Sequence, residues 1–283
     1  MLNGCAYILT VDVGNTFIRF GLFAEDSAAA QECPLATYET TPPSSITADE
    51  ARMRLAQVMG ALSADAGMPG ALVPAAAVLS CVVPALERPW KAALSRTCTG
   101  RVLTVGPGLK TGMPVHYDDP AEIGPDRIAD AVAARAVYGS PCIVIDLGTT
   151  TNIEVIDTRG TFVGGVIAPG LALGARSLSA AAARLPQVEP SAPTHVIGRN
   201  TREAMRSGVV LGEVARIDGM LDMVLAEMRA TKAAGEGSVP IVITGDDAEA
   251  LAALVGHSLT VDDALTLRGL AELYRINQKP RRA

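Results

Sequence analysis

The sequence of 283 residues is long enough for two domains of ordinary size, each with its own hydrophobic core. Hydrophobic residues make up 49% and charged residues 19%, which excludes a disordered chain, and the aromatic content of 4% predicts a core of aliphatic side chains. The formal net charge of −6 argues against a nucleic-acid partner, because nucleic acids select basic protein surfaces.

The cysteines and the apolar segments place the chain in a reducing, aqueous compartment. The five cysteines are widely separated and none forms a Cys-x-x-Cys pair, so we expect reduced thiols rather than a zinc site or a disulfide framework. The most apolar stretch, residues 71–86, contains two prolines and is too short to span a bilayer. No basic segment precedes an apolar one at the amino-terminus, as a secretion signal would require. We therefore expect a cytoplasmic protein without a membrane partner.

The first half alternates strand and helix patterns, which is typical of an α/β protein. Strands are predicted where β-branched and apolar residues cluster, and helices where apolar residues recur every three or four positions. The predicted elements are a hairpin over residues 7–23, a loop over 27–50, a helix over 48–60, a strand over 76–83, a helix over 84–97 and a loop over 106–125.

The second half continues the same alternation. Its glycine- and proline-rich segment, residues 164–170, is interpreted as a tight bend between a sheet and a helix. The other predicted elements are a helix over 126–138, a strand over 142–146, a turn over 148–151, a strand over 153–156, a helical region over 202–229, a linker over 231–238, a strand over 239–244 and a frayed basic tail over 279–282.

One motif occurs twice, each time between two predicted strands. Residues 12–16 read Asp-Val-Gly-Asn-Thr and residues 146–150 read Asp-Leu-Gly-Thr-Thr, and the two aspartates are 134 positions apart. That spacing is about one domain length, so the repeat indicates an ancient duplication. We expect a first domain over residues 1–120 and a second over 121–283, which bring two glycine turns and two carboxylates to one cleft.

The residue types in these turns suit a nucleotide. Glycine lets a ligand approach the backbone closely, and successive N–H groups in a turn bind phosphate oxygens. Asn15, Thr16 and Thr149 add side-chain donors, and Asp12 can hold Mg²⁺ together with phosphate oxygens. The alternative is that each motif only marks a hairpin turn, but two copies at domain spacing favour phosphate binding.

A third constellation opens the predicted helix that runs to residue 138. Asp126 at this helix start can be a capping residue or a partner of the helix dipole. In a phosphoryl transfer it can instead be the general base that orients an attacking hydroxyl group. The adjacent Arg127 can bind a carboxylate of the acceptor through two parallel hydrogen bonds.

Taken together and in order, these motifs resemble the type III pantothenate kinase family. The resemblance covers nearly the whole chain. The motifs that carry it are residues 12–16, Gly124-Pro125-Asp126-Arg127, residues 146–149, the Gly-Gly-x-Ile-x-Pro-Gly of residues 164–170 and Leu185-Pro186, with supporting matches at residues 80–84, 113–120, 198–201 and 265–270.

The resemblance implies an α/β fold of two ribonuclease H-like domains of the actin-like ATPase type, with mixed sheets flanked by helices and an active site in the cleft between the domains. It implies an enzyme that phosphorylates the 4′-hydroxyl group of pantothenate with ATP, the first step towards coenzyme A. It also implies Mg²⁺, a monovalent cation (K⁺ or NH₄⁺) and a homodimer whose pantothenate pocket lies near the dimer interface.

Carried over motif by motif, the resemblance also implies site residues. Asp126 is the implied general base, and Asp146 is implied to help hold the monovalent cation. The implied ATP-binding residues are Asp12, Val13, Gly14, Asn15, Thr16, Phe17, Ile18, Arg19 and Thr149, with Asp12 also on Mg²⁺. The implied acceptor contacts are Tyr117, Gly124, Pro125, Arg127 and Thr201.

The sequence departs from the family pattern beside both implied ligands. Thr150, Asn152 and Glu154 stand where the second phosphate motif has Ala, Thr and Asp, Ala182 replaces a threonine before Leu-Pro, and Asp246 follows a Thr-Gly that is usually Thr-Gly-Gly. Two alternatives therefore stay open. One is a kinase of the same fold with another small hydroxylated acceptor, and the other is a catalytically weak module that senses a ligand.

Overall fold

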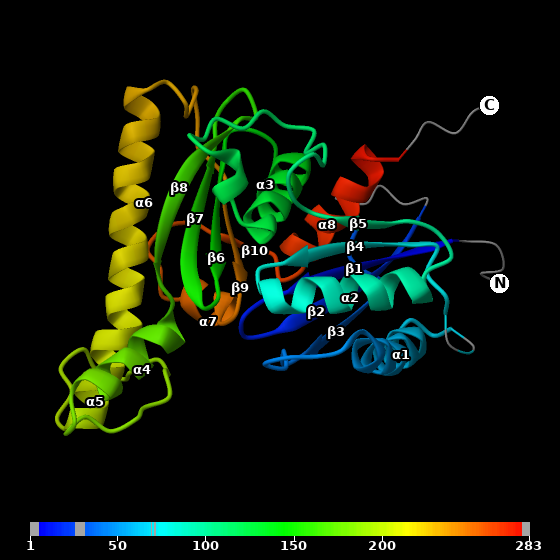
Figure 1. Ribbon diagram of the computed structural model, residues 1–283. Coiled ribbons are helices and arrows are strands. Elements are labelled where there is room, and N and C mark those ends of the chain that lie inside the picture. The colour runs from blue at the N-terminus through cyan, green and yellow to red at the C-terminus, as the bar shows by residue number, and fades with distance from the viewer. Residues whose placement is uncertain (1–5, 26–31, 69, 71, 279–283) are drawn as a thin grey trace. The chain divides into compact units, whose positions relative to one another are not determined.

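The computed structural model describes residues 6–25, 32–68, 70 and 72–278 (Figure 1). The described chain forms two compact units, one of Met1–Val137 with Ala264–Ala283 and the other of Tyr138–Asp263. The basic tail predicted over residues 279–282 lies outside the described residues. Among the described helices, none is both long and apolar enough to cross a membrane.

The first unit is built on a five-stranded mixed sheet. Its strands, in their order across the sheet, are β3 (Ala36–Thr40), β2 (Ile18–Ala24), β1 (Tyr7–Val13), β4 (Ala76–Cys81) and β5 (Val102–Thr104). The first three pair antiparallel, whereas β4 and β5 run parallel to β1. The predicted hairpin over residues 7–23 is therefore confirmed as β1 and β2, and β1 lies at the centre of the sheet.

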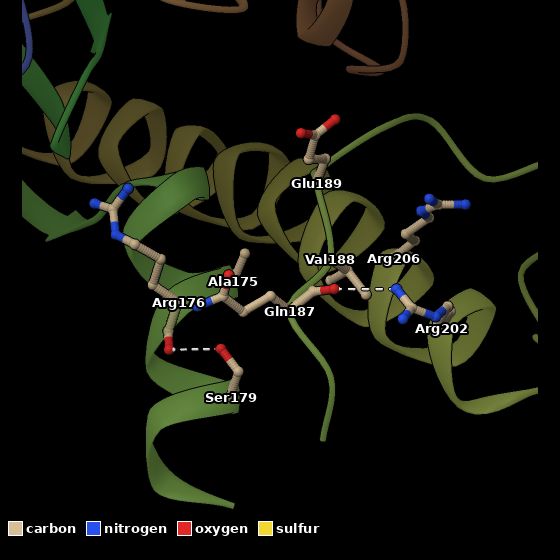
Figure 2. Close-up of a pocket in the computed structure, with 8 residues that line it drawn as sticks. All are labelled: Ala175, Arg176, Ser179, Gln187, Val188, Glu189, Arg202 and Arg206. Carbon is tan, nitrogen blue, oxygen red and sulfur yellow. Dashed lines mark hydrogen bonds between the residues drawn. The ribbon is translucent and has the colours of Figure 1, made fainter. Parts of the chain in front are cut away.

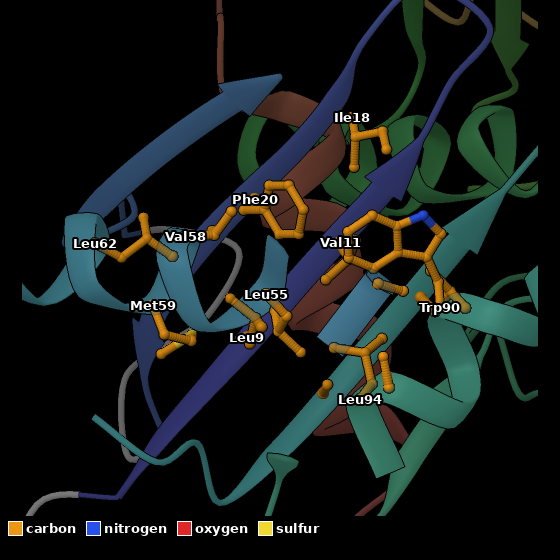
Figure 3. Packing of buried hydrophobic residues seen from close by; sticks show 14 of the residues in the cluster. Leu9, Val11, Ile18, Phe20, Leu55, Val58, Met59, Leu62, Trp90 and Leu94 are labelled. Atoms are coloured by element: carbon orange, nitrogen blue, oxygen red, sulfur yellow. The ribbon is translucent and has the colours of Figure 1, made fainter. Parts of the chain in front are cut away.

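Two helices, α1 (Ala48–Asp65) and α2 (Pro84–Thr97), cover one face of this sheet (Figure 1). They pack on the odd-numbered side chains of β1, and the packed cluster includes Leu9, Phe20 and Trp90 (Figure 3). The rings of Phe20 and Trp90 lie 5.6 Å apart in a tilted arrangement, which is a favourable geometry for an aromatic pair. This core holds β1 and β2 rigidly from one side.

The other face of the first sheet carries α8 (Leu265–Ile276), which contacts β1, β2 and β4. Helix α8 in turn packs closely on α3 (Pro125–Tyr138), because a Cβ on Gly269 would overlap the carbonyl oxygen of Ala129. The domain boundary predicted at residue 120 assigned the residues of both helices to the second half. The structure groups them with the first unit instead, because their apolar faces are buried there.

The second unit repeats this plan. Its sheet has the order β10 (Thr260–Val261), β9 (Ile241–Gly245), β6 (Cys142–Leu147), β7 (Thr150–Ile156) and β8 (Phe162–Pro169). Strands β6, β7 and β8 pair antiparallel, and β9 and β10 continue the sheet in parallel. The remaining helices are α4 (Leu171–Ala181), α5 (Thr201–Arg206), the π-helical segment η2 (Ser207–Leu211), α6 (Gly212–Ala230) and α7 (Ala248–Ala252), while the short η1 (Pro120–Glu122) belongs to the first unit.

Each sheet therefore consists of three antiparallel strands followed by two parallel ones, with the first strand in the middle. This is the strand order of a ribonuclease H-like domain, so the predicted α/β fold with two such domains is confirmed. In both units the aspartate of the repeated motif lies near the end of the central strand, Asp12 in β1 and Asp146 in β6.

Three sequence predictions were wrong in detail. The loop predicted over residues 27–50 contains β3, an edge strand whose side chains are largely exposed, so it lacks the apolar pattern that predicts a strand. The bend predicted over residues 164–170 lies mostly within β8, where Gly164 adopts φ +125° beside a β-bulge in the pairing with β7. The single helical region over 202–229 is interrupted by the π-helical turn η2.

The close contact between α3 and α8 predicts that Gly269→Ala destabilises the first unit. The added methyl group has no room beside Ala129, and such overpacking costs about 1–3 kcal/mol. Thermal unfolding followed by circular dichroism measures the effect. The matched control is Gly60→Ala in α1, where a Cβ meets nothing within 4 Å, so this variant should be neutral or slightly more stable. Equal stability of the two variants would contradict the packing described here.

Candidate functional site

The turn between β1 and β2 presents its tip to solvent. The Gly14 N–H donates to the carbonyl oxygen of Phe17 at 2.9 Å, and a Cβ on Gly14 would lie only 2.9 Å from that oxygen. Asn15 and Thr16 are exposed at the tip, while Val13 and Ile18 at its base are buried in the core. The geometry places backbone and side-chain donors where a phosphate group can reach them.

Asp12 lies at the base of this turn, on the face of β1 opposite the α1–α2 core. It is 8% exposed, and its Oδ1 atom has no hydrogen-bond partner among the described residues. Burial raises its pKa to about 6, and the charge of Asp126 acts in the same direction. The hydroxyl group of Ser80 and the guanidinium of Arg19 lower the pKa and offset part of this shift.

Asp126 is the second residue of α3 and belongs to the same unit as Asp12. Its Oδ1 atom accepts the Arg127 backbone N–H at 2.8 Å, and a Cβ on Gly124 would overlap that oxygen. Burial raises the pKa of Asp126, while the Arg127 N–H, its own N–H and the Arg127 guanidinium lower it. A raised carboxyl pKa suits a general base that must hold and release a proton near neutral pH.

The first unit thus brings together two motifs that are more than a hundred residues apart in the chain. Asp12 and Asp126 are close enough for their charges to interact, and Arg127, 5% exposed, lies beside Asp126. Tyr117 is half-buried in the segment that precedes η1 in the same unit. Thr201, by contrast, belongs to the second unit, where it is the first residue of α5.

The second glycine turn, between β6 and β7, is held by two further segments. Gly148 donates its N–H to the Thr150 carbonyl oxygen at 3.0 Å, and the Gly170 N–H donates to the Thr149 carbonyl oxygen at 3.1 Å. A Cβ on Gly170 would overlap the Gly148 carbonyl oxygen, and a Cβ on Gly245 would overlap that of Leu147. The glycines of three separate motifs therefore meet at one turn.

Asp146 has polar neighbours on both adjacent strands. It pairs in register with Asn152 on β7 and with Thr244 on β9, so the three side chains share one face of the sheet. Asn152 and Thr244 are buried, and the Asn152 Oδ1 atom has no hydrogen-bond partner among the described residues. Such a row of oxygen atoms is the donor set that hard cations prefer.

The carboxylates of the first unit fit Mg²⁺ held in the manner usual for kinases. No group of three or more His, Cys, Asp or Glu side chains able to hold a metal ion occurs in the described part of the chain. Mg²⁺ is commonly held by one or two carboxylates, with phosphate oxygens and waters completing its shell. The unpartnered Oδ1 atom of Asp12 is a suitable ligand of this kind.

The departures from the family motif occupy different environments. Glu154 is fully buried in β7, two residues beyond Asn152 on the same face. Ala182 directly follows the last residue of α4 and caps the helix, because its N–H donates to the Leu178 carbonyl oxygen. The Asp246 N–H donates to the Leu147 carbonyl oxygen at 2.6 Å. Asp246 therefore supports the second turn through a backbone hydrogen bond, which does not depend on the identity of its side chain.

A pocket of about 470 Å³ lies elsewhere in the second unit, between α4, α5 and the segment that connects them (Figure 2). Its lining includes Arg176, Arg202, Arg206 and Glu189. The Arg202 guanidinium donates to the Gln187 carbonyl oxygen at 3.2 Å, and the other charged side chains point in different directions rather than toward one centre (Figure 2). None of the residues that the sequence assigned to a site lines this pocket.

Sequence reasoning missed the polar residues that surround the two aspartates. Ser80 pairs in register with Asp12, and Thr244 pairs with Asp146, so the parallel neighbour strand supplies a hydroxyl group in each unit. The signal was present, because both residues interrupt otherwise apolar strands. This signal can be interpreted only when the pairing register of the strands is known, and a single sequence does not reveal that register.

The raised pKa of Asp12 predicts a pH-dependent effect of Asp12→Asn on stability. The folded-state pKa of about 6 exceeds the ordinary value of 3.8, so ionised Asp12 destabilises the folded protein above pH 6. Without Mg²⁺ or nucleotide, Asp12→Asn should be more stable than the wild type at pH 8, by up to about 3 kcal/mol. Wild-type stability should recover relative to the variant as the pH falls through 6 towards 4.

Urea unfolding at pH 4, 6 and 8 measures this difference. The matched control is Asp65→Asn at the exposed end of α1, which should change stability by no more than about 0.5 kcal/mol at any of these pH values. A variant no more stable than the wild type at pH 8 would refute the assignment of a strained, buried carboxylate to Asp12.

Comparison with known proteins identifies the family. The profile of the type III pantothenate kinase family matches residues 8–223. A type III pantothenate kinase from Koribacter versatilis is 36% identical over 96% of each chain, and one from Nocardia farcinica is 39% identical over 97% of this chain and 99% of its own. A solved Baf family protein from Campylobacter jejuni, 18% identical, covers 95% of this chain and 98% of its own with a TM-score of 0.57, which supports the fold alone. This chain belongs to the type III pantothenate kinase family.

Proposed function

We propose that Asp126 is the general base of an ATP-dependent pantothenate kinase. The activity follows from the family: the enzyme transfers a phosphoryl group from ATP to pantothenate, gives 4′-phosphopantothenate and so contributes to coenzyme A biosynthesis. The observation that carries the role of Asp126 is its position beside Asp12 with a raised pKa. A carboxylate there can accept the hydroxyl proton of pantothenate as the phosphoryl group is transferred.

The nucleotide is assigned to the two glycine turns. ATP phosphates are bound by the backbone and side-chain donors of residues 12–19 and by Thr149, and Mg²⁺ is held by Asp12 together with phosphate oxygens. Support comes from the exposed donors at the first turn and from the unpartnered Asp12 Oδ1 atom. Bound Mg²⁺ neutralises charge on the phosphates, and Asp12 orients it.

The acceptor is assigned to Tyr117, Gly124, Pro125, Arg127 and Thr201. Arg127 supplies the positive charge that recognises the carboxylate of pantothenate, in a chain whose net charge of −6 otherwise repels anions. The absence of a side chain at Gly124 lets the Asp126 carboxylate lie against the backbone at the start of α3.

A monovalent cation, K⁺ or NH₄⁺, is assigned to Asp146. The support is the row of oxygen-bearing side chains formed by Asp146, Asn152 and Thr244 on one face of the second sheet. The half-buried Thr149 lies in the turn that follows Asp146, so a cation at Asp146 would lie next to the proposed phosphate site in the same hairpin.

A homodimer and a cytoplasmic location complete the proposal. The second unit exposes the apolar side chains of Ile167, Leu178, Val196 and Ile197, the last of which is 82% exposed. Exposed apolar groups of this kind are typical of surfaces that a second subunit covers.

The cysteines support the cytoplasmic location. The thiols of Cys33, Cys81, Cys98 and Cys142 are free, which is compatible with a reducing compartment.

The test of the base is Asp126→Asn, assayed as ADP release that depends on pantothenate. The amide keeps the shape of the side chain but cannot accept the proton, so kcat should fall by about 10²–10⁴ while the Kd for ATP changes little. Asp118→Asn, an exposed carboxylate in the preceding segment, is the matched control and should retain wild-type turnover. Wild-type turnover by Asp126→Asn would disprove the assignment.

The assigned role of Arg127 predicts a selective loss of acceptor binding. Arg127→Met should raise the KM for pantothenate by at least about tenfold, because a charge-assisted hydrogen bond is lost, and should leave the Kd for ATP within about twofold of wild type. Arg135→Met on the same helix, whose guanidinium binds the Gly112 carbonyl oxygen instead, controls for effects on α3. If the KM for pantothenate is unchanged in Arg127→Met, a residue other than Arg127 binds the carboxylate of pantothenate.

A further inference from the structure

An ion pair on α6, with Glu213 buried and Arg216 partly exposed, contacts β7 and the end of β8 beside the second phosphate turn. Glu213 is 5% exposed, and its Oε1 atom accepts a hydrogen bond from the Thr151 hydroxyl group at 2.6 Å. Its Oε2 atom accepts from Nη2 of Arg216, one turn further along the helix. The same Nη2 atom donates to the carbonyl oxygen of Pro169 at 2.5 Å. The result is a continuous chain of polar contacts from β7 through α6 to the end of β8.

Both ends of this network lie next to the turn itself. Thr151 follows the turn directly on β7 and pairs with Ala168 on β8. Pro169 precedes Gly170, whose N–H donates to the Thr149 carbonyl oxygen and whose Cα packs against the Gly148 carbonyl oxygen. Because these backbone atoms are already in close contact, a shift of Pro169 would move the turn as well.

Packing alone does not account for a charged residue at this position. The neighbouring buried positions of α6 are Val214, Ile217 and Leu221, which belong to the apolar core of the second unit. A carboxylate buried in such a place contributes little net stability even when it is paired, and an apolar side chain of similar volume is often as good or better. A buried glutamate and its partly exposed arginine partner, which together connect β7, α6 and the end of β8, are better explained by a requirement for geometry.

We infer that Glu213 and Arg216 are positioning residues that hold the second phosphate turn in the geometry that binds nucleotide. Glu213 acts through the Thr151 hydroxyl group and Arg216 acts through the Pro169–Gly170 backbone. The inference rests on the proposed assignment of ATP to Thr149. It concerns nucleotide affinity and makes no claim about the acceptor.

Direct ATP binding without pantothenate, measured by titration calorimetry, tests the inference. Thr151→Val removes one hydroxyl group without changing the volume, and it should raise the Kd for ATP about tenfold. Thr151→Ser keeps the hydroxyl group and should restore wild-type affinity. Glu213→Gln should weaken ATP binding in the same direction, and the double variant should be no weaker than Glu213→Gln alone, because both changes break one network.

The matched control removes a comparable contact at the far end of the same hairpin. Arg159 binds Asp157 at 3.1 Å just beyond β7, about 20 Å along the strand from the phosphate turn. Arg159→Gln should therefore leave the Kd for ATP unchanged. The KM for pantothenate should be unchanged in every variant, since the network does not reach the residues assigned to the acceptor.

The possible outcomes separate this inference from the proposed function. Folded Thr151→Val and Glu213→Gln variants that bind ATP like the wild type would overturn the inference and leave the kinase assignment intact. The same holds if Thr151→Ser loses as much affinity as Thr151→Val, because the effect would then be one of packing. A wild-type protein that binds no ATP would overturn the nucleotide site together with the inference.

Discussion

Two interacting carboxylates, one buried and one half-buried, are the constraint on which the first unit depends. Asp12 and Asp126 raise the free energy of the folded state when ionised, and only a rigid surrounding structure can keep them in place. That rigidity comes from the core on the other face of β1 and from the close packing of α3 on α8. Mg²⁺ bound by Asp12, as proposed, would relieve this repulsion and would thereby link metal loading to folding stability.

The two glycine turns share one sequence motif but are supported in different ways. The first is closed by its own backbone, from Gly14 to Phe17, and its tip is exposed. The second is held by Gly170 and Gly245 from two other segments, and behind it lies the polar network of α6. A self-contained turn can adjust to its ligand, whereas the braced turn is fixed before the ligand arrives, which lowers the entropy lost on binding.

The fold was predictable from sequence wherever one pattern decided the structure. The hairpin of residues 7–23 follows from clustered β-branched and apolar residues, and the helix starting at Ala48 and the helix over residues 84–97 follow from apolar periodicity. The edge strand β3 and the glycine-rich β8 could not be predicted, because they are held by pairing with neighbours rather than by their own side chains. The site residues could be proposed from motifs, but the electrostatic contact between Asp12 and Asp126 depends on tertiary packing that no local pattern encodes.

The return of α8 to the first unit has a consequence for how the protein acquires its structure. This helix is formed by residues 265–276, after the entire second unit in the chain, yet it covers the face of the first sheet that carries Thr10 and Gly21. During synthesis on a ribosome, the first sheet must therefore wait with that face uncovered while the second unit emerges and folds. The amino-terminal sheet, although made first, is therefore completed last, and until α8 emerges its uncovered face is open to misfolding.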